Sequence, residues 1–407
     1  MMTITQAHTI LSNIITTIGL PSPKHIELCP CDDALGRVLA EDIMAPFESP
    51  RFTNSSMDGF AIQADDIIPL HAVYLCIGES SAGNGFTDHV PQGCCVRIST
   101  GAPLPMTTNT IIPIEDIDIL SDTTISVRYP QAVKQGQYVR LQGSEFDTHT
   151  LLLPVGTYCS PSVLALCASI GRTQIQVYRQ PRVGIVTTGN ELLPAGTALS
   201  SPHQIYDSNT PLLRHAIRQS GGIPVMALHT QDSLDTICHA IETLCAHSDL
   251  VITSGGASVG VHDLVRRAAQ TCGFTEHFFG VRQKPGKPMF CYTRDTSVLI
   301  GLPGNPASVM MCYMEYVHGF IGSLHGFVRP QASAIAVLAR PISAPHDRDE
   351  FVRVCVYEKQ GILYAEPLLQ QQSFMITSLT LAQGFVRCSA GVFYHIGESV
   401  MVRYWLT

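Results

Sequence analysis

Residues 181–326 carry the most regular hydrophobic pattern of the chain. Short apolar runs of strand length alternate there with amphipathic stretches of helix length. The apolar runs lie at 183–186, 225–228, 250–252 and 298–300, and helices are predicted at 210–221, at 233–247, from 263 onward and through 310–319. Four strand-loop-helix repeats predict a parallel sheet with helices on both faces. Ligands of such sheets bind beyond the carboxyl ends of the strands, where these loops lie.

The flanking regions have different patterns. Residues 1–44 are predicted to be helical, with an amphipathic helix at 34–42. Residues 45–143 form short apolar runs broken by Pro, Gly, Asn and Ser, which is typical of β-structure, and a short helix is predicted at 160–171. Near the C-terminus, alternation puts Val352, Val354 and Val356 on one strand face and Arg353 on the other, which predicts a small β-barrel or sandwich.

Composition narrows the function classes. The chain has 25 Lys and Arg against 33 Asp and Glu, a net charge of −8, with 45% hydrophobic and 14% charged residues. These values are typical of globular domains and exclude a disordered chain, and the negative charge argues against nucleic-acid binding. Pro and Gly interrupt both charge-free stretches, at 151–171 and 296–314, so neither predicts a membrane span. The 14 scattered Cys, without C-x-x-C spacing or a basic leader, favour free thiols in a reducing cytosol.

Three carboxylates follow predicted strands of the α/β region. Glu191 lies in TTGNEL, Asp207 in IYDSN, and Asp263 directly after the glycine-rich loop. Carboxylate oxygens are ligands that Mg²⁺ prefers, and Mg²⁺ usually keeps waters and bridges substrate phosphates. Because Asp207 and Asp263 also stand where helices begin, helix capping is the alternative for each taken singly. Their recurrence at one sheet edge favours a ligand site.

Loops at the same edge have the composition of an anion site. Ser254-Gly-Gly-Ala-Ser-Val-Gly260 offers backbone N–H groups at a helix N-terminus, although it lacks the Gly-Lys-Ser/Thr of a P-loop. Lys284-Pro-Gly-Lys287 places two cations on a turn, for which a solvated surface turn is the alternative. Gly301-Leu-Pro-Gly-Asn-Pro306 is equally explained as a tight strand-to-helix connection.

Two motifs of the β-rich region carry polar side chains in turns. Asn54-Ser-Ser-Met-Asp58-Gly59-Phe60 places a carboxylate in a turn, and Ser99-Thr100-Gly101 places a hydroxyl beside a flexible kink. Local hydrogen bonding in turns explains both without any function.

Together, these segments resemble one family. NSSMDGF resembles its N-S-A-M-D-G-Y signature, RISTGAPLP its R-I-x-T-G-A-P-x-P, and TTGNEL its S-T-G-D-E-L. IYDSN, TSGGASVG, KPGKP, GLPGNP and the early ALGRVLAED also follow the family pattern. These motifs span residues 34–308 and are similar to those of the molybdopterin molybdenumtransferases, the MoeA family that includes the E domain of gephyrin. The C-terminal region matches only loosely.

The resemblance implies a multidomain α/β plus β fold with four parts. These are an extended linker domain (1–44 and 145–179), an inserted β-rich domain (45–144), a central molybdopterin-binding-like α/β domain with a parallel sheet (180–326) and a C-terminal β-barrel domain (327–407). It also implies a homodimer whose active site is shared between the subunits. No nucleic acid and no membrane is expected as a partner.

The resemblance further implies an enzyme, a transferase of molybdenum cofactor biosynthesis. Its substrates would be molybdate and adenylylated molybdopterin, and molybdenum would be inserted with Mg²⁺-dependent release of AMP. A cytoplasmic location and an upstream molybdopterin adenylyltransferase partner are expected. A non-catalytic molybdopterin-binding scaffold or carrier with the same fold is the alternative, while an adenylyltransferase is disfavoured because that activity usually needs only the α/β domain.

Carried over by position, the resemblance assigns site residues. The catalytic set is Asp58, Thr100, Glu145, Glu191, Asp207, Asp263, Lys284 and Lys287, of which Glu191, Asp207 and Asp263 would hold the metal. The substrate-binding set is Ser208, Ser254, Gly255, Gly256, Ser258, Gly260, Pro303, Asn305, Arg353 and Ser373. Asp58 and Thr100 would come from the partner subunit, and Arg353 and Ser373 from the HDRDEFVR and QQQS segments of the barrel.

Two positions depart from the family pattern. Glu145 stands where the family usually has aspartate, one methylene shorter, and Asn190 stands where Asp is more frequent. The longer side chain at 145 can shift a bound group by about an ångström, which matters if the position is catalytic. The change at 190 removes one negative charge beside Glu191.

Overall fold

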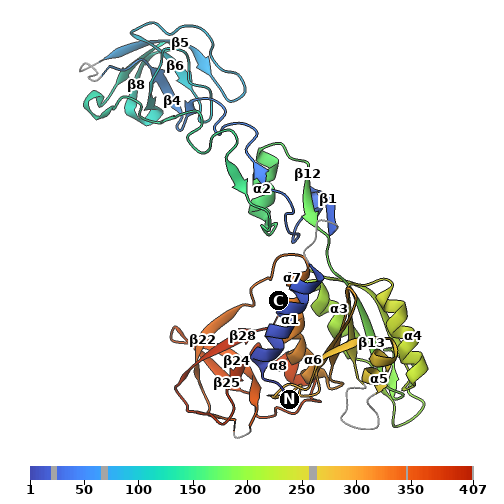
Figure 1. The fold of residues 1–407 in the computed structure, drawn as a ribbon. Coiled ribbons are helices and arrows are strands. Elements are labelled where there is room, and N and C mark those ends of the chain that lie inside the picture. Colours follow the sequence, from blue (N-terminus) through green and yellow to red (C-terminus); the bar gives the residue numbers. More distant parts are fainter. Residues whose placement is uncertain (20–24, 66–71, 256–263, 345–346, 406–407) are drawn as a thin grey trace. The chain divides into compact units, whose positions relative to one another are not determined.

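The computed structural model describes residues 1–19, 25–65, 72–255, 264–344 and 347–405. The chain divides into two compact units (Figure 1). The first comprises Met1–Glu41, Gly156–Leu164 and Thr173–Thr407, and the second Asp42–Val155 and Ala165–Arg172. The four domain boundaries expected from the sequence stay predictions.

A six-stranded sheet forms the centre of the first unit (Figure 1). Its order is β16 (Ile223–Thr230), β13 (Arg182–Thr188), β17 (Leu250–Ser254), β21 (Ser297–Leu302), β20 (Phe290–Arg294) and β18 (Thr275–Phe279). The four strands predicted from the apolar runs are parallel to one another. β20 pairs antiparallel with both of its neighbours, so the sheet extends beyond the predicted strands by an antiparallel pair.

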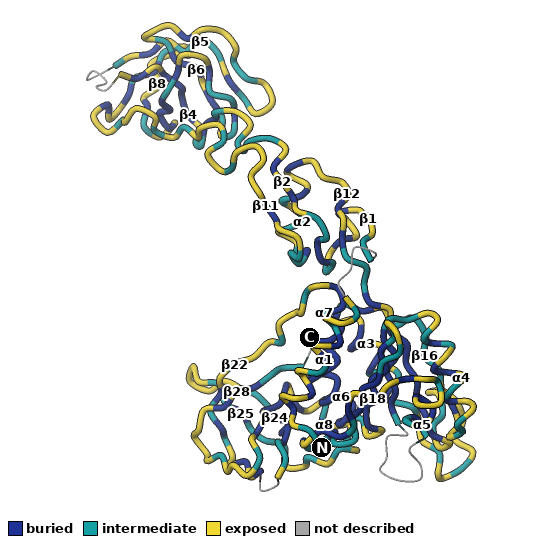
Figure 2. Tube along the Cα trace, viewed as in Figure 1, coloured by how far each residue is buried: buried dark blue, intermediate teal, exposed yellow. Residues whose placement is uncertain are grey.

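Helices cover both faces of this sheet. One face packs on α4 (Leu234–Cys245) and α5 (Leu264–Thr271), through a core that includes Val186, Val251 and Ile241. The other face packs on a second core, which includes Val183 and Ile252. The helices that contribute to this core are α1 (Ile4–Ile18), α3 (Asn209–Gln219), α6 (Pro306–Cys312), the π-helical segment η5 (Tyr313–Val317) and α7 (His318–Leu324). Burial on both faces explains the continuous apolar runs of these strands (Figure 2).

The N-terminal helix is real, but the amphipathic helix predicted at 34–42 is wrong. Gly36 has a φ of 79°, in the left-handed region, which an α-helix does not allow. The backbone N–H of Leu39 donates to the carbonyl of Thr157 at 2.9 Å instead of to a helical neighbour. Ala34, Val38 and Leu39 are buried, and their spacing produced the helical pattern although distant segments supply the packing. Nearby, β1 (Ile26–Pro30) pairs antiparallel with β12 (Gln174–Tyr178).

The C-terminal part of the first unit is a closed five-stranded barrel, which resolves the expected choice between barrel and sandwich. The strands follow the ring order β24 (Asp349–Lys359), β25 (Ile362–Pro367), β22 (Ser333–Leu338), β28 (Ser399–Tyr404) and β26 (Gly384–Cys388), and β26 pairs again with β24. β19 (Gln283–Lys284) joins β24 at the edge, which ties the α/β domain to the barrel. β23 (Ile342–Ser343), β27 (Phe393–Tyr394) and α8 (Thr377–Leu381) complete this part.

The second unit is β-rich, as predicted. Its sheet has the order β7 (Thr110–Pro113), β4 (Gly59–Ile62), β6 (Cys94–Ile98), β5 (Val73–Ser80), β9 (Thr124–Val127) and β8 (Ile117–Ser121). Phe60, Ile62, Ile112 and Ile125 form its core. Two short antiparallel pairs also belong to this unit, β3 (Asn54–Ser55) with β10 (Val139–Arg140) and β2 (Ile43–Met44) with β11 (Leu151–Leu153). The short helix predicted at 160–171 is α2 (Pro161–Ser169).

Two further expectations concern the whole chain. All 14 cysteines are free thiols. Among the described residues, no helix combines the length and the apolar character needed to cross a membrane.

Candidate active site

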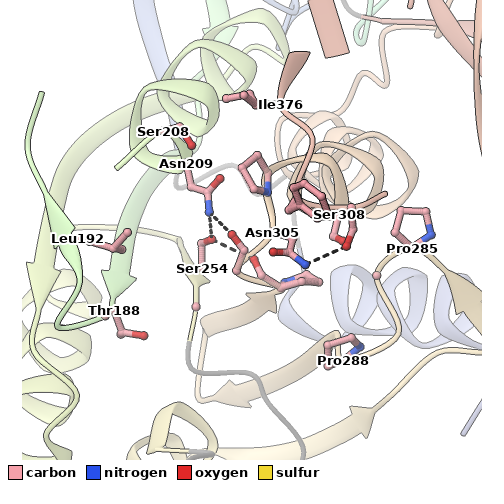
Figure 3. Close-up of a pocket in the computed structure, with 18 of the residues that line it drawn as sticks. Thr188, Leu192, Ser208, Asn209, Ser254, Pro285, Pro288, Asn305, Ser308 and Ile376 are labelled. Carbon is pink, nitrogen blue, oxygen red and sulfur yellow. Dashed lines mark hydrogen bonds between the residues drawn. The ribbon is translucent and has the colours of Figure 1, made fainter. Parts of the chain in front are cut away.

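A pocket of about 1090 Å³ lies in the first unit at the carboxyl ends of β13, β17 and β21 (Figure 3). This is the edge at which the topology predicts ligand binding. One side, here called the strand-end wall, consists of lining residues within 188–192, 205–209, 254–255 and 303–306. The opposite side, here called the barrel-side wall, consists of residues 283–288, Arg348 and lining residues within 371–376. Ten of the predicted site residues line the pocket: Glu191, Asp207, Ser208, Ser254, Gly255, Lys284, Lys287, Pro303, Asn305 and Ser373.

Asp207 is held firmly at the start of α3. Its Oδ1 accepts the backbone N–H groups of Asn209 and Thr210 at 2.9 and 3.0 Å. Its Oδ2 accepts the hydroxyls of Thr210 and Thr187 at 2.6 and 3.1 Å. Asp207 therefore satisfies two of the unpaired backbone N–H groups at the start of α3, so the helix-capping alternative is confirmed for this residue. The neighbouring Ser208 makes no capping hydrogen bond, although it lines the pocket.

Asn209 joins three loops of the strand-end wall, a role not expected from the sequence. Its Nδ2 donates to Ser254 Oγ at 2.9 Å and to the carbonyl of Gly304 at 2.6 Å (Figure 3). Ser254 Oγ in turn donates to the carbonyl of Pro303 at 3.0 Å. The wall is thus fixed by hydrogen bonds between loops that are distant in sequence but meet at one sheet edge. Asn209 is the last residue of the D-S-N motif, and this motif is the signal that could have identified it.

Glu191 is the free carboxylate of this wall. β14 (Leu192–Leu193) and β15 (Ile205–Tyr206) pair in parallel beside it. Its side chain is exposed and has no hydrogen-bond or ion-pair partner among the described residues. Asn190 accepts the backbone N–H of Asp232 through Oδ1 at 3.1 Å. The amide therefore links two loops at the pocket rim, and Asp232 is a further carboxylate there that sequence reasoning missed.

The two lysines of the barrel-side wall differ in their partners. Lys284 Nζ lies 2.9 Å from Glu350 Oε1 on β24, so part of its charge is neutralised. Lys287 lines the pocket without a carboxylate partner among the described residues. Both lysines face the pocket, where an anion can use the unneutralised charge.

The barrel contributes a buried arginine and a segment that lines the pocket. Arg353 has no exposed surface, and its Nε and Nη1 lack hydrogen-bond partners in the part of the chain that the structure describes. Its Nη2 donates to the carbonyl of Gln372 at 3.2 Å, while the amide of Gln371 bonds both backbone groups of Arg353. Burial lowers the pKa of Arg353. Next to Gln372, Ser373 Oγ accepts from Asn305 Nδ2 at 2.8 Å, which joins the two walls.

Three predicted residues lie in the second unit. The backbone N–H of Thr100 donates to Asp58 Oδ1 at 2.6 Å, and this bond holds the pKa of the exposed Asp58 carboxyl below its usual value. The structure thus brings Asp58 and Thr100 together from two loops, one before β4 and one after β6. Glu145 Oε2 accepts from Ser49 Oγ at 2.6 Å.

The other predicted residues lie outside the described part of the chain. They are Gly256, Ser258, Gly260 and Asp263. Among the residues that the structure describes, no three His, Cys, Asp or Glu side chains gather closely enough to hold a metal ion. The expected three-carboxylate site therefore stays a prediction.

Some residues that line the pocket were not named from the motifs of the family resemblance. Gln283 and the apolar Phe374 and Ile376 line the barrel-side wall, as does Arg348, which lies in the HDRDEFVR segment but was not named as a site residue. They come from separate parts of the chain and share no local spacing, so a sequence pattern has nothing to detect.

Comparisons with known proteins match this architecture along the whole chain. Family models describe the MoeA N-terminal region (domain I and II) at residues 2–171, a probable molybdopterin binding domain at 184–322, and the MoeA C-terminal region (domain IV) at 335–405. A molybdopterin molybdenumtransferase of Haemophilus influenzae is 31% identical over 372 residues, covering 90% of each chain. Molybdopterin molybdenumtransferase 2 of Mycobacterium tuberculosis is 30% identical, covering 89% of this chain and 92% of that one.

Solved structures agree with these relatives. A molybdopterin biosynthesis MoeA protein from Pyrococcus horikoshii has a TM-score of 0.79 and 27% identity, covering 97% of this chain and 98% of that one. A second structure, from Pyrococcus horikoshii OT3, has a TM-score of 0.84 at 24% identity over the full length of both chains and supports the fold. The chain therefore belongs to the MoeA family of molybdopterin molybdenumtransferases, enzymes that act late in molybdenum cofactor biosynthesis.

Proposed function

We propose that the chain inserts molybdenum from molybdate into adenylylated molybdopterin, with Mg²⁺-dependent release of AMP. The observation that carries this proposal is the pocket, in which a wall with carboxylates and hydroxyls faces a wall with two lysines across about 1090 Å³. That volume suits a large ligand. Walls of opposite charge suit two anionic substrates and a cation that must meet in one place.

The barrel-side wall is suited to molybdate. Lys287 lacks a carboxylate partner among the described residues, and Arg353 is a buried cation with two unpartnered nitrogens. Arg353 is not among the lining residues, but it bonds the carbonyl of Gln372 beside the pocket. Buried cations without counter-charges favour binding of an anion nearby, because the anion supplies the missing charge. Lys284 and Lys287 would bind molybdate or phosphate directly, and Ser373 with Asn305 would orient it.

The strand-end wall is suited to the nucleotide-linked phosphates and Mg²⁺. Mg²⁺ is commonly held by one or two carboxylates together with substrate phosphates and waters, and it supplies charge neutralisation for phosphoanhydride cleavage. Glu191 offers free carboxylate oxygens, whereas all four hydrogen bonds of Asp207 go to the protein. The described donors therefore fit a metal bound mainly through Glu191 and substrate, with Asp207 and Asp263 as the further proposed ligands. Ser208, Ser254, Gly255 and Pro303 would shape the phosphate site, together with Gly256, Ser258 and Gly260.

The proposed chemistry needs positioning more than covalent catalysis. Water cleaves the phosphoanhydride, so that AMP leaves and the phosphate stays on the pterin. The two dithiolene sulfurs of the substrate then replace two molybdate oxygens on molybdenum. These oxygens leave as two waters, which take the two thiol protons and two protons from solvent. Lysines hold the oxyanion near the sulfurs, and the hydrogen-bonded loops of Asn209 and Ser254 keep the phosphates in register.

The proposed enzyme is a cytoplasmic homodimer, with Asp58 and Thr100 of one subunit completing the site of the other. Glu145 would act in the same shared site. The free thiols are consistent with a reducing compartment. A molybdopterin adenylyltransferase would supply the substrate.

An AMP-release assay tests the proposal. Purified protein is incubated with adenylylated molybdopterin and Mg²⁺, with and without molybdate, and the product is offered to an apo-molybdoenzyme. Molybdate-dependent AMP release with reconstitution of the apo-enzyme is the expected result. Tight pterin binding without AMP release would instead favour a carrier or scaffold.

A further inference from the structure

Gln283 lies against the lysine turn at residues 284–287 and has no exposed surface. Its Nε2 donates to the carbonyl of Gly286, between the two lysines, at 3.3 Å and to Cys312 Sγ at 3.4 Å. Its Oε1 accepts the hydroxyl of Tyr316. One buried amide therefore connects the turn that carries both pocket lysines to the η5 segment.

The turn packs directly on this amide. Gly286 has a φ of 95°, and a Cβ there would lie 2.3 Å from Cys312 Sγ and 2.7 Å from Gln283 Nε2. The backbone N–H of Val281 donates to the carbonyl of Lys287 at 3.0 Å and closes the turn. A rotation or loss of the Gln283 amide would therefore remove the contact that fixes Gly286, and with it the spacing of Lys284 and Lys287.

Tyr316 fixes the orientation of the amide. Its side chain is nearly fully buried, and its ring packs against that of His8 on α1 at 5.0 Å between centroids. Burial raises the pKa of Tyr316, so its hydroxyl stays a neutral donor. Because this donor occupies Gln283 Oε1, the amide presents Nε2 to Gly286.

We propose that Gln283 and Tyr316 are positioning residues for the anion held by Lys284 and Lys287. The pair sets the conformation of the lysine turn without touching the anion. This inference rests on the proposed function for the identity of the anion, molybdate. It adds two residues, neither of which belongs to the motifs that carry the family resemblance.

The test measures molybdate binding by calorimetry and the molybdate dependence of AMP release. Tyr316→Phe removes only the hydroxyl and leaves Gln283 Oε1 unpaired. We expect it to weaken molybdate binding and to raise the KM for molybdate by about tenfold, with kcat changed much less, because one positioning contact is lost. Gln283→Met, which keeps the length but not the hydrogen bonds, should have the same effect.

Tyr313→Phe is the matched control. Tyr313 is equally buried in η5, but its hydroxyl bonds Ser220 Oγ at 2.7 Å, away from the lysine turn. We expect a similar drop in the midpoint of thermal unfolding for both Tyr variants, and an unchanged molybdate affinity only in Tyr313→Phe. The double variant Gln283→Met with Tyr316→Phe should bind molybdate no more weakly than either single variant, since both act through one contact.

The outcomes separate this inference from the proposed function. If the wild-type chain binds molybdate but releases no AMP, the proposed function fails, while the inference is decided by the affinities of the variants. Equal affinities in Tyr316→Phe and wild type, an equal loss in Tyr313→Phe, or additive losses in the double variant would each overturn it. Absence of molybdate binding by the wild-type protein would overturn it as well.

Discussion

The two walls of the pocket are built in different ways. The strand-end wall is fixed by hydrogen bonds among loops of one domain, in which Asp207 accepts four and Asn209 donates two. The barrel-side wall depends on a contact between two domains and on a buried amide that packs against the lysine turn. Lys284 pairs with Glu350 of the barrel, and Gln283 bonds Tyr316 of η5. The acidic wall is therefore fixed within the α/β domain, whereas the basic wall depends also on packing of the barrel on that domain.

This difference suggests how each wall fails. Substitution in the strand-end wall removes a bond at the site itself and should change the chemical step. Substitution among the supports of the barrel-side wall keeps both lysines in the chain but shifts their positions. Such a shift should weaken anion binding before it lowers the maximal rate.

The largest effect is expected for Asp207→Ala. It removes four hydrogen bonds at the start of α3 and a carboxylate of the pocket. We expect AMP release to fall by about 100-fold or more, while the free energy of unfolding falls by only about 1–2 kcal/mol and the chain stays folded. Denaturant unfolding and the AMP-release assay measure the two effects.

Asp235→Ala is the control for this substitution, because Asp235 is an exposed carboxylate in the first turn of α4, outside the pocket lining. It should leave AMP release unchanged. Full activity in Asp207→Ala would mean that the active site has been placed at the wrong sheet edge.

Lys287→Ala should have the next largest effect. Lys287 has no carboxylate partner among the described residues, whereas Lys284 shares its charge with Glu350. We expect Lys287→Ala to lower AMP release by about 100-fold and to weaken molybdate binding more than Lys284→Ala does. Lys359→Ala, at an exposed barrel position, controls for loss of one positive charge. A stronger effect at Lys284 than at Lys287 would contradict this ordering.

The contrast between the walls also explains what the sequence could predict. The strand-loop-helix repeats predicted the sheet and its binding edge, and local motifs named Asp207 and Ser254, because both lie in motifs of the loops at that edge. The predicted helix at 34–42 failed since tertiary contacts, not local propensity, bury its apolar residues. Gln283 was missed because it belongs to none of the motifs and owes its role to a buried contact with Tyr316. Contacts of that kind follow from packing and have no local spacing.

Substitution of Glu315 should affect the barrel-side wall more weakly, because Glu315 helps to hold the barrel against η5. Its buried carboxylate accepts from His8 Nε2 at 2.9 Å, bonds Arg403 of β28, and lies 4.0 Å from Arg387 of β26. Burial alone would raise the pKa of Glu315, but the bond from His8 and the charge of Arg403 outweigh burial, and the pKa is lowered. Glu315→Gln should cost about 2–4 kcal/mol of folding free energy at neutral pH, because Arg403 loses its buried partner.

The pH dependence of that cost has a definite sign. A lowered folded-state pKa means that the Glu315 carboxylate stabilises the fold above its ordinary value of 4.5, and that this stabilisation is lost as the pH falls through the folded-state value. The difference in unfolding free energy between wild type and Glu315→Gln should therefore shrink in acid. Glu358→Gln, at an exposed position of β24, should show no such difference. If the difference in unfolding free energy between wild type and Glu315→Gln stays constant down to low pH, an ionised Glu315 is excluded as its cause. The expected effect of Glu315→Gln on activity is a few-fold rise in the KM for molybdate.

The smallest effect is expected for Glu145→Asp, which lies outside both walls. Glu145 is exposed in the second unit, and its carboxylate accepts one hydrogen bond, from Ser49 Oγ at 2.6 Å. The shorter side chain keeps the charge, and loss of an exposed hydrogen bond costs at most about 1 kcal/mol. We expect unchanged or slightly increased AMP release, measured beside Ser49→Ala, which removes the same bond without altering the carboxylate. A large loss in Glu145→Asp alone would contradict this expectation and would mean that the local geometry is built around the longer side chain.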